Sequence, residues 1–503
     1  MGAGITGLAA AHRVVELATT RRLPIDVVLF EARDRLGGTI HTTRRDGFLI
    51  EGGPDSFITQ KPWGLSLVKR LGLEGRLIQT NPACRRTFVV RDGRMHAVPE
   101  GFLLLAPTRI WPFVTSRLFS WPAKLRMALD LVIPARDHGS EGDESLSSFV
   151  IRRFGREALE RVAQPLVSGI YTADPTDLSL RATMPRFLEM EARYGSIIRA
   201  MRAERRAAPG TAAKAGRKDR RDAGPASHPD PTGGRGDSGA RYSLFVSFAE
   251  GMSTLIDALA ARLPDGSIRR ATPVRGLQRI GDRWRVALAD GAYESADGVI
   301  LACPAYVSAE LLAGLDAELA AELAGIRYAS SATMSLAFRR DQVPHALDGF
   351  GFVVPAVEER ALIAATFSSV KFAGRAPDGW VLVRAFLGGA MHAHVFELAD
   401  ADLREAVVRD LRALLGVQGP PRFAELHRWP RSMPQYPVGH LQRVKRIEGR
   451  LAGLPGLAVA GNAFGGVGIP DCVHSAETAA ERVVAGLTAA GTHDRAAHPA
   501  ERA

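Results

Sequence analysis

Six residues at the start of the chain have the types and the spacing needed to hold a diphosphate. Gly2-Ala3-Gly4-Ile5-Thr6-Gly7 matches the pattern GxGxxG, and an apolar helical pattern follows it through Leu17. In such a turn the first glycine allows a tight bend, the second lets the backbone approach a pyrophosphate, and the third lets a helix pack closely against a strand. The free N–H groups and the dipole at the start of the helix favour an anion. The motif therefore predicts a dinucleotide-binding site.

An acidic residue follows at the spacing that a ribose requires. Residues 25–30 form an apolar strand pattern that ends at Glu31, 24 residues after Gly7. A carboxylate at this place accepts hydrogen bonds from the hydroxyl groups of the adenosine ribose. Arg35-Leu36-Gly37-Gly38-Thr39 follows at once and places a second glycine pair beside the dinucleotide. This combination favours FAD over NAD.

A dinucleotide-binding unit needs a buried strand before its first glycine, and only Met1 precedes Gly2. FAD proteins commonly carry an apolar residue, often valine, in that position. We hypothesise that Met1 represents an internal valine codon, GTG, read as a start, and that the first strand is encoded upstream. A chain that begins at Met1 would lack the central strand of its cofactor domain, and we expect it to bind FAD weakly.

Apolar runs and glycine loops continue along the chain. Strand patterns are predicted at 48–51, 268–274, 284–288, 299–303 and 457–460, and a helix is predicted to begin near 251. Gly461 closes the last strand, and the glycine loop 465–470 leads into a helix predicted from Asp471 to Gly486. A glycine loop that opens a helix can present backbone N–H groups to a flavin.

Composition indicates a soluble globular protein of two or three domains with a sizeable core. The chain has 503 residues, 46% of them hydrophobic, and a net charge of +11. Its three cysteines, Cys84, Cys303 and Cys472, are odd in number and far apart, which excludes a disulfide framework and fits a reducing cytoplasm. We expect neither a membrane-spanning helix nor a signal peptide, because no run of 18 apolar residues and no basic-then-apolar leader is present.

Residues 205–240 contain no large apolar side chain and carry an excess of Lys and Arg. Such a segment cannot bury enough apolar surface to offset its ordering entropy, so we predict a disordered insertion. The basic run 217–221 suggests nucleic acid only weakly, because no aromatic residues lie between the charges, and we expect no nucleic-acid partner. The tail at 489–503 is predicted to be disordered too.

The order of the motifs resembles the oxygen-dependent porphyrinogen oxidases of haem biosynthesis, FAD enzymes that act on protoporphyrinogen IX or coproporphyrinogen III. The segments that carry the resemblance are GAGITGLAAAH, FEARDRLGGTI, EGGPDSF, EGMSTLIDAL, VILACPA and GNAFGGVGIPDCVHSAETAAE. The first two also occur in amine oxidases and phytoene desaturases, whereas EGGPDSF and GVGIPDC are more particular. The resemblance covers residues 2–487 apart from 205–240.

The resemblance implies an α/β, amine-oxidase-like flavoprotein. It would combine an FAD-binding Rossmann-like domain built from discontinuous segments with a mixed-sheet substrate domain and a helical membrane-contact region. The expected divisions are 1–80, 241–305 and 441–488 for the FAD domain, 81–204 for the helical and substrate region, and 306–440 for the substrate domain.

The resemblance, together with the motifs, also implies which residues contact FAD. The backbone of Val274 would hold the adenine. The expected contacts are Gly2, Ala3, Gly4, Ile5, Thr6, Gly7, Glu31, Ala32, Arg35, Gly37, Gly38, Thr39, Gly53, Pro54, Asp55, Ser56, Val274, Gly461, Val467, Gly468 and Ile469.

The implied reaction removes six electrons from a porphyrinogen, with dioxygen as the acceptor and hydrogen peroxide as the product. The flavin supplies the redox chemistry, so we assign no catalytic acid or base. A flat macrocycle requires an apolar cleft with cations at its edge for the propionates. Arg85 and Arg86 are the candidates, and the corresponding arginine of plant and animal enzymes aligns with Thr87, so Arg86 and Thr87 are predicted substrate contacts. Simple surface charge is the alternative, and the choice of porphyrinogen stays open.

Residues 101–133 are apolar, with Trp111 and Trp121 among several aromatic residues, and Arg109, Arg117, Lys124 and Arg126 are interspersed. This pattern fits a helix pair that lies on an anionic membrane surface, and equally fits ordinary core helices with exposed basic faces. We expect a cytoplasmic protein, free or peripheral at the inner face of the cell membrane, and leave monomer and homodimer open.

The remaining features suggest structural roles. His392 and His394 would face the same way on a strand, but no third ligand has a recognisable spacing, so no metal is expected. Cys472 is predicted to be a buried thiol. The alternative functions are a related FAD amine oxidase or phytoene-desaturase-like enzyme, and a non-catalytic, truncated flavoprotein.

Overall fold

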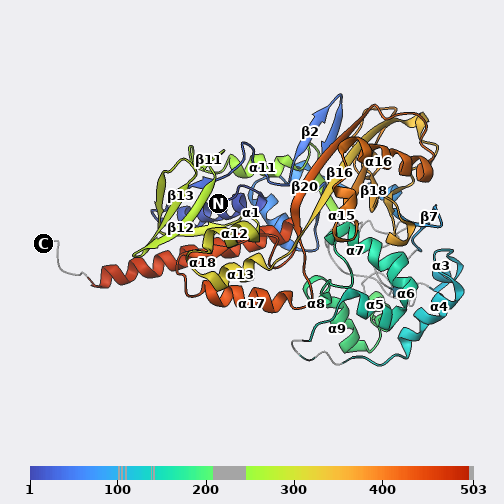
Figure 1. Ribbon diagram of the computed structural model, residues 1–503, viewed down its shortest axis with the longest axis horizontal. Coiled ribbons are helices and arrows are strands. Elements are labelled where there is room, and N and C mark those ends of the chain that lie inside the picture. The colour runs from blue at the N-terminus through green and yellow to red at the C-terminus, as the bar shows by residue number, and fades with distance from the viewer. Residues whose placement is uncertain are drawn as a thin grey trace, which may run out of the picture.

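The computed structural model describes residues 1–99, 102–103, 106–107, 110–136, 139, 142–207 and 245–497. In Figure 1 the part that contains α1 lies at the left, a large sheet lies at the upper right, and a group of helices lies below that sheet. Most of the predicted insertion, residues 208–240, and the end of the predicted tail, residues 498–503, lie outside the described residues.

The left-hand part contains two pairs of parallel strands and two long helices. β1 (Leu29–Phe30) pairs with β11 (Ile268–Arg269), and β15 (Val299–Leu301) pairs with β21 (Leu457–Val459). The helices are α1 (Ile5–Arg21) and α18 (Ile469–Ala497), which lie against each other although they come from opposite ends of the chain (Figure 1). Val14 and Leu17 of α1 pack on Ala480 and Val484 of α18.

The first two residues join the strand pairs. The Met1 nitrogen donates to the Ile300 carbonyl at 2.8 Å, and the Gly2 N–H donates to the Phe30 carbonyl at 2.7 Å. Residues 1–2 therefore lie on the line between β1 and β15, where a central strand of the sheet is expected. The expectation that an upstream segment forms this strand stays a prediction.

Smaller elements complete this part. They are α2 (Pro62–Arg70), α11 (Ser253–Ala260), α12 (Ala305–Leu312), α13 (Ala317–Ala324), α17 (His440–Leu451), the sheet of β4 (Phe57–Ile58), β10 (Phe245–Phe248) and β5 (Leu77–Gln79), and the sheet of β12 (Val274–Ile280), β13 (Arg283–Leu288) and β14 (Tyr293–Ala296). The hairpin of β2 (Thr42–Arg45) and β3 (Phe48–Glu51) lies beside the large sheet at the upper right of Figure 1.

Seven strands form one mixed sheet in the order β20-β16-β19-β18-β17-β6-β7. Their bounds are β20 (Phe423–Pro434), β16 (Tyr328–Arg339), β19 (Trp380–Gly388), β18 (Ala364–Phe367), β17 (Gly349–Val353), β6 (Arg86–Arg91) and β7 (Arg94–Ala97). β6 pairs with β17 in parallel, and the other neighbours are antiparallel. Residues 86–97, which fall within the predicted 81–204 region, thus form one edge of the sheet that the 306–440 segment provides.

The two faces of this sheet differ in chemistry. Alternate residues of β19 from Val381 to Leu387 lie in an apolar core with α15 (Ala393–Phe396) and α16 (Asp400–Leu415). Because successive side chains of a strand point to opposite faces, Arg384 and Phe386 lie on the other face. The second face is turned toward the left-hand part of the molecule, since Arg384 hydrogen-bonds to the Gly53 carbonyl.

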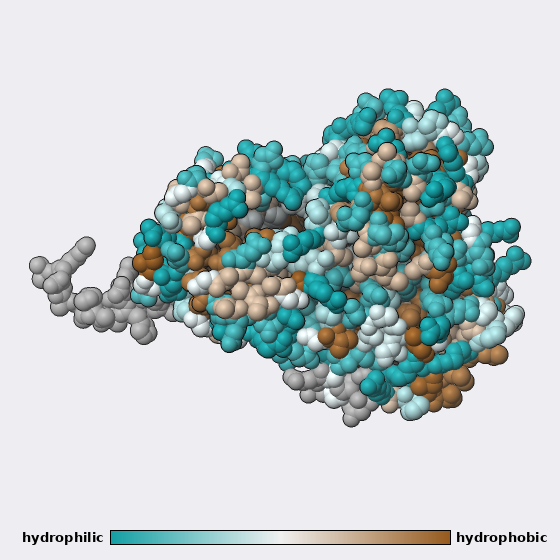
Figure 2. All heavy atoms as spheres, in the orientation of Figure 1, coloured by the Kyte–Doolittle hydropathy of each residue, from teal (hydrophilic) through white to brown (hydrophobic). Residues whose placement is uncertain are grey.

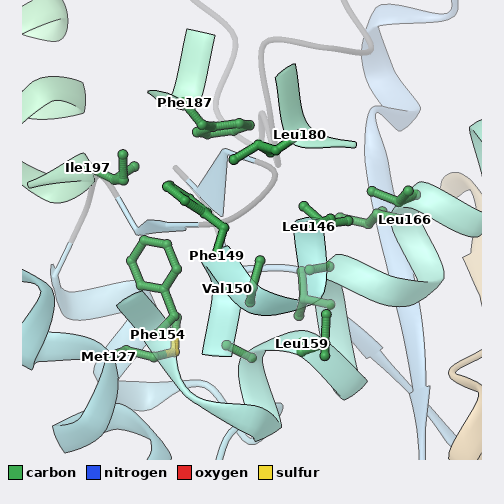
Figure 3. Packing of buried hydrophobic residues seen from close by; sticks show 14 of the residues in the cluster. Met127, Leu146, Phe149, Val150, Phe154, Leu159, Leu166, Leu180, Phe187 and Ile197 are labelled. Atoms are coloured by element: carbon green, nitrogen blue, oxygen red, sulfur yellow. The ribbon is translucent and has the colours of Figure 1, made fainter. Parts of the chain in front are cut away.

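The helical region packs around its own apolar core. Figure 3 shows Phe149 and Phe154 of one helix and Phe187 of another in this core, and the rings of Phe149 and Phe187 lie 6.3 Å apart between their centroids. Its helices are α3 (Ile110–Thr115), α4 (Trp121–Ala128), α5 (Leu146–Phe154), α6 (Arg156–Ala158), the π-helical turn η4 (Leu159–Ala163), α7 (Gln164–Tyr171), α8 (Leu180–Thr183), α9 (Pro185–Tyr194) and α10 (Ile197–Ala207).

A buried ion cluster joins the helices of this region. The side chains of Arg153, Asp130 and Glu191 are all inaccessible to solvent. The Arg153 Nε–H donates to Asp130 at 2.6 Å, and a second nitrogen of the guanidinium lies 3.3 Å from Glu191. The guanidinium also donates to the Gly195 carbonyl at 2.8 Å. One side chain thus ties the end of α5 to the segment after α4 and to the end of α9.

Two local expectations differ from the structure: the last helix extends into the predicted disordered tail at 489–503, and His392 and His394 do not lie on a strand. α18 continues to Ala497 rather than ending near Gly486, because the alanine-rich sequence beyond it favours a helix. His392 and His394 lie in short helical turns, not on a strand, and among the described residues no three His, Cys, Asp or Glu side chains gather as metal ligands would. None of the described helices is long and apolar enough to cross a bilayer.

Replacing Arg153 with methionine is expected to lower the free energy of unfolding by about 3–5 kcal/mol, because it leaves the buried carboxylate of Asp130 without its cation and leaves Glu191, among the described residues, with Arg152 alone. Denaturant unfolding measures the change. Arg186→Met is the control, since Arg186 forms an exposed ion pair with Glu204 and its loss is expected to cost less than about 1 kcal/mol. Equal losses for the two variants would contradict this account.

Candidate active site

The start of α1 is shaped to receive an anion. Gly4 is its N-cap, has no side chain to cap the free N–H groups, and no acidic residue lies in the first turn. The positive end of the helix dipole is therefore available to an anionic ligand. Close packing explains the third glycine: a Cβ on Gly7 would lie 1.7 Å from the carbonyl oxygen of Gly2.

Glu31 stands beside this turn with its carboxylate fixed in place. One carboxylate oxygen accepts from the Ala3 N–H at 2.6 Å, and the other accepts from the Arg33 N–H at 3.0 Å. The backbone N–H of Thr272 donates to the Glu31 carbonyl at 2.8 Å, so the segment leading into β12 runs alongside. This hydrogen bond places Thr272, two residues before Val274 at the start of β12, beside Glu31, and the adenine contact of Val274 stays a prediction.

The loop of residues 35–39 closes over the first glycine turn. The Gly37 N–H donates to the Ala3 carbonyl at 2.8 Å. The Arg35 guanidinium donates to the carbonyl groups of Leu36 and Gly38, at 3.2 Å and 2.6 Å. Arg35 therefore shapes this loop through its own backbone, a role that the sequence did not indicate.

Residues 52–56 run between this loop and the large sheet. A Cβ on Gly53 would lie 1.6 Å from the Thr39 carbonyl oxygen, so only glycine fits here. The Gly52 carbonyl accepts hydrogen bonds from the Trp429 Nε1–H at 2.8 Å and from the Thr333 hydroxyl at 2.7 Å. The sheet thus holds the segment from its polar face.

Asp55 forms a half-buried ion pair in the same segment. Its carboxylate oxygens lie 3.0 and 3.1 Å from Lys371 Nζ, and one of them accepts from the Ser56 hydroxyl at 2.7 Å. Burial alone would raise the pKa of Asp55, but Lys371 and Arg384 outweigh it and hold the pKa well below its usual value. Asp55 is therefore an anion at neutral pH.

The last glycine loop is held by Tyr436. The Gly466 N–H donates to the Tyr436 hydroxyl at 3.0 Å, and that hydroxyl donates in turn to the Asn462 carbonyl. Burial raises the pKa of Tyr436 well above its usual value, so the hydroxyl keeps its proton. Ile469, at the end of the loop, lies in one apolar cluster with Ala3, which places the loop near the first glycine turn.

Two further residues that the sequence analysis named, Gly461 and Cys472, lie in this region. The Gly461 N–H donates to the Ser475 hydroxyl at 3.0 Å, and no atom lies within 4 Å of where a Cβ on Gly461 would be. Cys472 is buried, as predicted, and burial raises its pKa to about 12. A thiol with this pKa stays protonated and unreactive at neutral pH.

The predicted substrate residues lie at the edge of the large sheet. Arg86 is exposed and its guanidinium lies 2.9 Å from Asp348. Thr87 is buried on the same strand, opposite Gly351 of β17. Their contact with a substrate stays a prediction.

Sequence reasoning missed three residues that the structure brings to this region: Lys371, Arg384 and Tyr436. Arg384 did leave a signal, because it is the one charge in the apolar run 380–388. Lys371 and Tyr436 gave no such signal in the sequence, because the residues that they contact lie far away along the chain.

The chain belongs to the family of flavin-containing amine oxidoreductases, whose sequence pattern matches residues 5–484. Two curated relatives are named coproporphyrinogen III oxidase. The one from Bacillus subtilis (strain 168) is 35% identical and the alignment covers 95% of this chain and 96% of the relative, and the one from Propionibacterium freudenreichii is 38% identical with coverages of 97% and 91%. A crystal structure of a candidate protoporphyrinogen oxidase from Exiguobacterium sp. 255-15 is 31% identical, with a TM-score of 0.81 and coverages of 97% and 98%.

These similarities confirm the predicted fold, the predicted resemblance and the predicted cofactor, FAD. The structure fits that cofactor, because the uncapped start of α1, the fixed carboxylate of Glu31 and the open space beside Gly461 are features a dinucleotide would use. When bound, FAD supplies the two-electron oxidation chemistry. In the predicted arrangement α1 would hold the diphosphate, Glu31 would hold the ribose, and residues 52–56 and 466–469 would lie near the ring.

The close approach at Gly7 gives a direct test of the site. Gly7→Ala is expected to weaken FAD binding at least a hundredfold, because its Cβ would displace the backbone at Gly2; flavin fluorescence titration of the apoprotein measures this. Gly449→Ala is the matched control. Gly449 lies inside α17 with no atom near the new Cβ, so this variant is expected to keep its FAD affinity and to gain about 0.5–1 kcal/mol of stability. Unchanged FAD affinity in Gly7→Ala would argue against the assignment.

Proposed function

We propose that this protein oxidises coproporphyrinogen III to coproporphyrin III in haem biosynthesis, with dioxygen as the acceptor. Three two-electron steps remove six electrons, and three molecules of dioxygen take them up to give three of hydrogen peroxide. The observation that carries the proposal is the similarity over nearly the whole chain to two relatives that bear the name of this activity. Protoporphyrinogen IX is the alternative substrate.

Apolar side chains near the flavin loop suit a flat macrocycle. Val467 of that loop, Phe386 of the large sheet and Tyr171 at the end of α7 are all half-buried and pack on the same apolar core. They come from three parts of the fold that meet beside residues predicted to contact FAD. In this arrangement the protein positions the macrocycle and excludes water, while the redox chemistry belongs to the cofactor.

The first test compares the two substrates. With FAD supplied, porphyrin fluorescence is expected to appear above the autoxidation blank for coproporphyrinogen III, with a kcat/KM at least tenfold above that for protoporphyrinogen IX. Blank rates with both substrates would overturn the proposed function, and a preference for protoporphyrinogen IX would overturn the choice of substrate.

Arg86 gives a test of propionate recognition in the same assay. Arg86→Gln is expected to raise KM for coproporphyrinogen III about threefold, the size of one solvent-exposed charge contact. Arg339→Gln is the control, because Arg339 forms an exposed pair with Asp341 in a different part of the chain. Equal effects of the two variants would remove Arg86 from the substrate site.

We also propose that the protein is cytoplasmic and docks on the inner face of the cell membrane through α3, α4 and the turn after α4. Five large apolar side chains there are exposed: Trp111 (78%), Trp121 (64%), Leu125 (69%), Leu129 (48%) and Val132 (73%). Brown atoms gather over this end of the molecule at the lower right of Figure 2. A contiguous apolar surface of this kind is uncommon on a soluble protein unless it contacts a partner or a membrane.

Two basic residues of this segment, Lys124 and Arg126, are turned inward, whereas Arg117 is exposed and Arg109 lies outside the described residues. Lys124 is buried, and its ammonium group donates to the carbonyl groups of Val114 and Ser116 at 2.7 Å each. Arg126 donates to the Ile151 and Arg152 carbonyl groups. The expectation that core helices present basic faces to solvent is therefore wrong for these two residues. Membrane docking would depend on apolar insertion more than on attraction to anionic lipid.

Vesicle sedimentation tests this docking. The Trp121→Ser/Leu125→Ser variant is expected to lower the partition coefficient at least tenfold, since each side chain contributes about 1.5–3 kcal/mol when fully buried. Zwitterionic and anionic vesicles are expected to bind the native protein within threefold of each other. Tyr293→Ser, at an exposed aromatic residue of β14, is the control and should change nothing. Native-like binding by the double variant would refute the proposed docking surface.

The alternatives predicted from the sequence are tested by the same assays. An amine oxidase would turn over a primary amine and leave both porphyrinogens at the blank rate. A non-catalytic flavoprotein would be folded and inactive with every donor.

A further inference from the structure

Five charged side chains lie within or beside residues 51–56, which are predicted to pass near the flavin. Arg384, Arg375 and Lys371 are the cations, and Glu51 and Asp55 are the carboxylates. Arg375 is buried and donates to the backbone of residues 248–249, and Glu51 accepts from the Met252 N–H and the Thr42 hydroxyl at 2.8 Å each. Three cations face two carboxylates, so the cluster has one excess positive charge.

Within the described part of the chain, Arg384 is the member of this cluster that has an unused hydrogen-bond donor. Its side chain is only 3% exposed, one nitrogen donates to the Gly53 carbonyl, and its guanidinium lies 4.8 Å from the centroid of the Phe386 ring. Its Nε–H finds no acceptor among the described residues. A buried donor without an acceptor costs about 1–3 kcal/mol, so a group that accepts from it would stabilise the site.

We propose that Arg384 tunes the bound flavin: its charge favours the reduced cofactor, and its Nε–H is a hydrogen-bond donor toward the flavin ring. Reduction adds two electrons and a proton to the ring system and leaves it with a negative charge at neutral pH. A cation held in a water-poor site stabilises that charge more strongly than it would in water. Asp55, paired with Lys371, moderates the effect by offsetting part of the cluster's positive charge.

A purely structural cluster would behave differently. If the five charges only held residues 51–56 in place, the loss of any one of them would disturb the segment, and Arg384→Met and Asp55→Asn would move the potential in the same direction or leave it unchanged. Tuning by charge predicts opposite signs instead. Arg384→Met removes a positive charge, whereas Asp55→Asn removes a negative one and keeps an oxygen that can accept from Ser56.

The experiment measures the ratio of reduced to oxidised flavin in each holoenzyme at equilibrium with a redox dye. Arg384→Met is expected to lower this ratio at least tenfold at a fixed dye potential, which is about 30 mV for a two-electron couple. Asp55→Asn is expected to raise it at least threefold. Arg384→Lys, which keeps the charge, is expected to stay within threefold of the native protein.

The matched control is Arg360→Met. Arg360 also carries an Nε–H without an acceptor among the described residues, but it pairs with Asp410 on α16, across the sheet from Gly53. The Arg360→Met variant is expected to keep the ratio of reduced to oxidised flavin within threefold of the native value. If Arg384→Met holds no FAD, Lys371→Met replaces it, with a fall expected. Any pattern other than a fall on losing the cation and a rise on losing the carboxylate overturns the proposal. Dyes replace porphyrinogen in this measurement, so its outcome is independent of the substrate assigned above.

Discussion

Two adjacent carbonyl groups, those of Gly52 and Gly53, join the large sheet to the dinucleotide-binding part. Trp429 and Thr333 donate to the first and Arg384 donates to the second, so strands β20, β16 and β19 all meet one short segment. Buried hydrogen bonds of this kind have strict geometry and are costly to leave unmade. They fix the distance between the sheet and the glycine loops, and the site exists only where that distance is held.

The large sheet can hold residues 52–53 in place because its two faces differ in chemistry. One face is covered by α16 and is apolar along its length, which anchors the strands. The middle of the other face carries arginine, threonine, histidine and tryptophan, and buried polar groups of this kind are stable only when they find partners. The backbone of residues 52–53 supplies several of those partners. Two groups of this face are exceptions, because the Arg384 Nε–H and the His427 Nδ1 find no partner among the described residues.

The dinucleotide turn could be predicted from the sequence because its logic is local. Gly7 packs on Gly2 and Glu31 follows one helix later, so spacing alone locates them. The ion pair of Asp55 with Lys371 could not be predicted, because the two residues are 316 positions apart in the sequence. They meet only through the pairing of strands in the large sheet, and no sequence motif indicates that pairing. Lys124 shows a different limit. Periodicity indicated two faces for its helix but not that the long side chain would turn inward to backbone carbonyl groups.

The pairing of α1 with α18 sets the order of events during synthesis. The glycine turn leaves the ribosome early, while the helix that packs on α1 and the loop near Ile469 come more than 450 residues later. At about 5–20 residues per second this interval lasts roughly 20–90 s. Contacts between residues so distant in sequence form late. Until α18 has been synthesised, α1 of the nascent chain therefore lacks the helix on which it packs. Cofactor loading therefore follows release of the chain, and the free FAD concentration at that moment governs how much of the protein is captured in its native form.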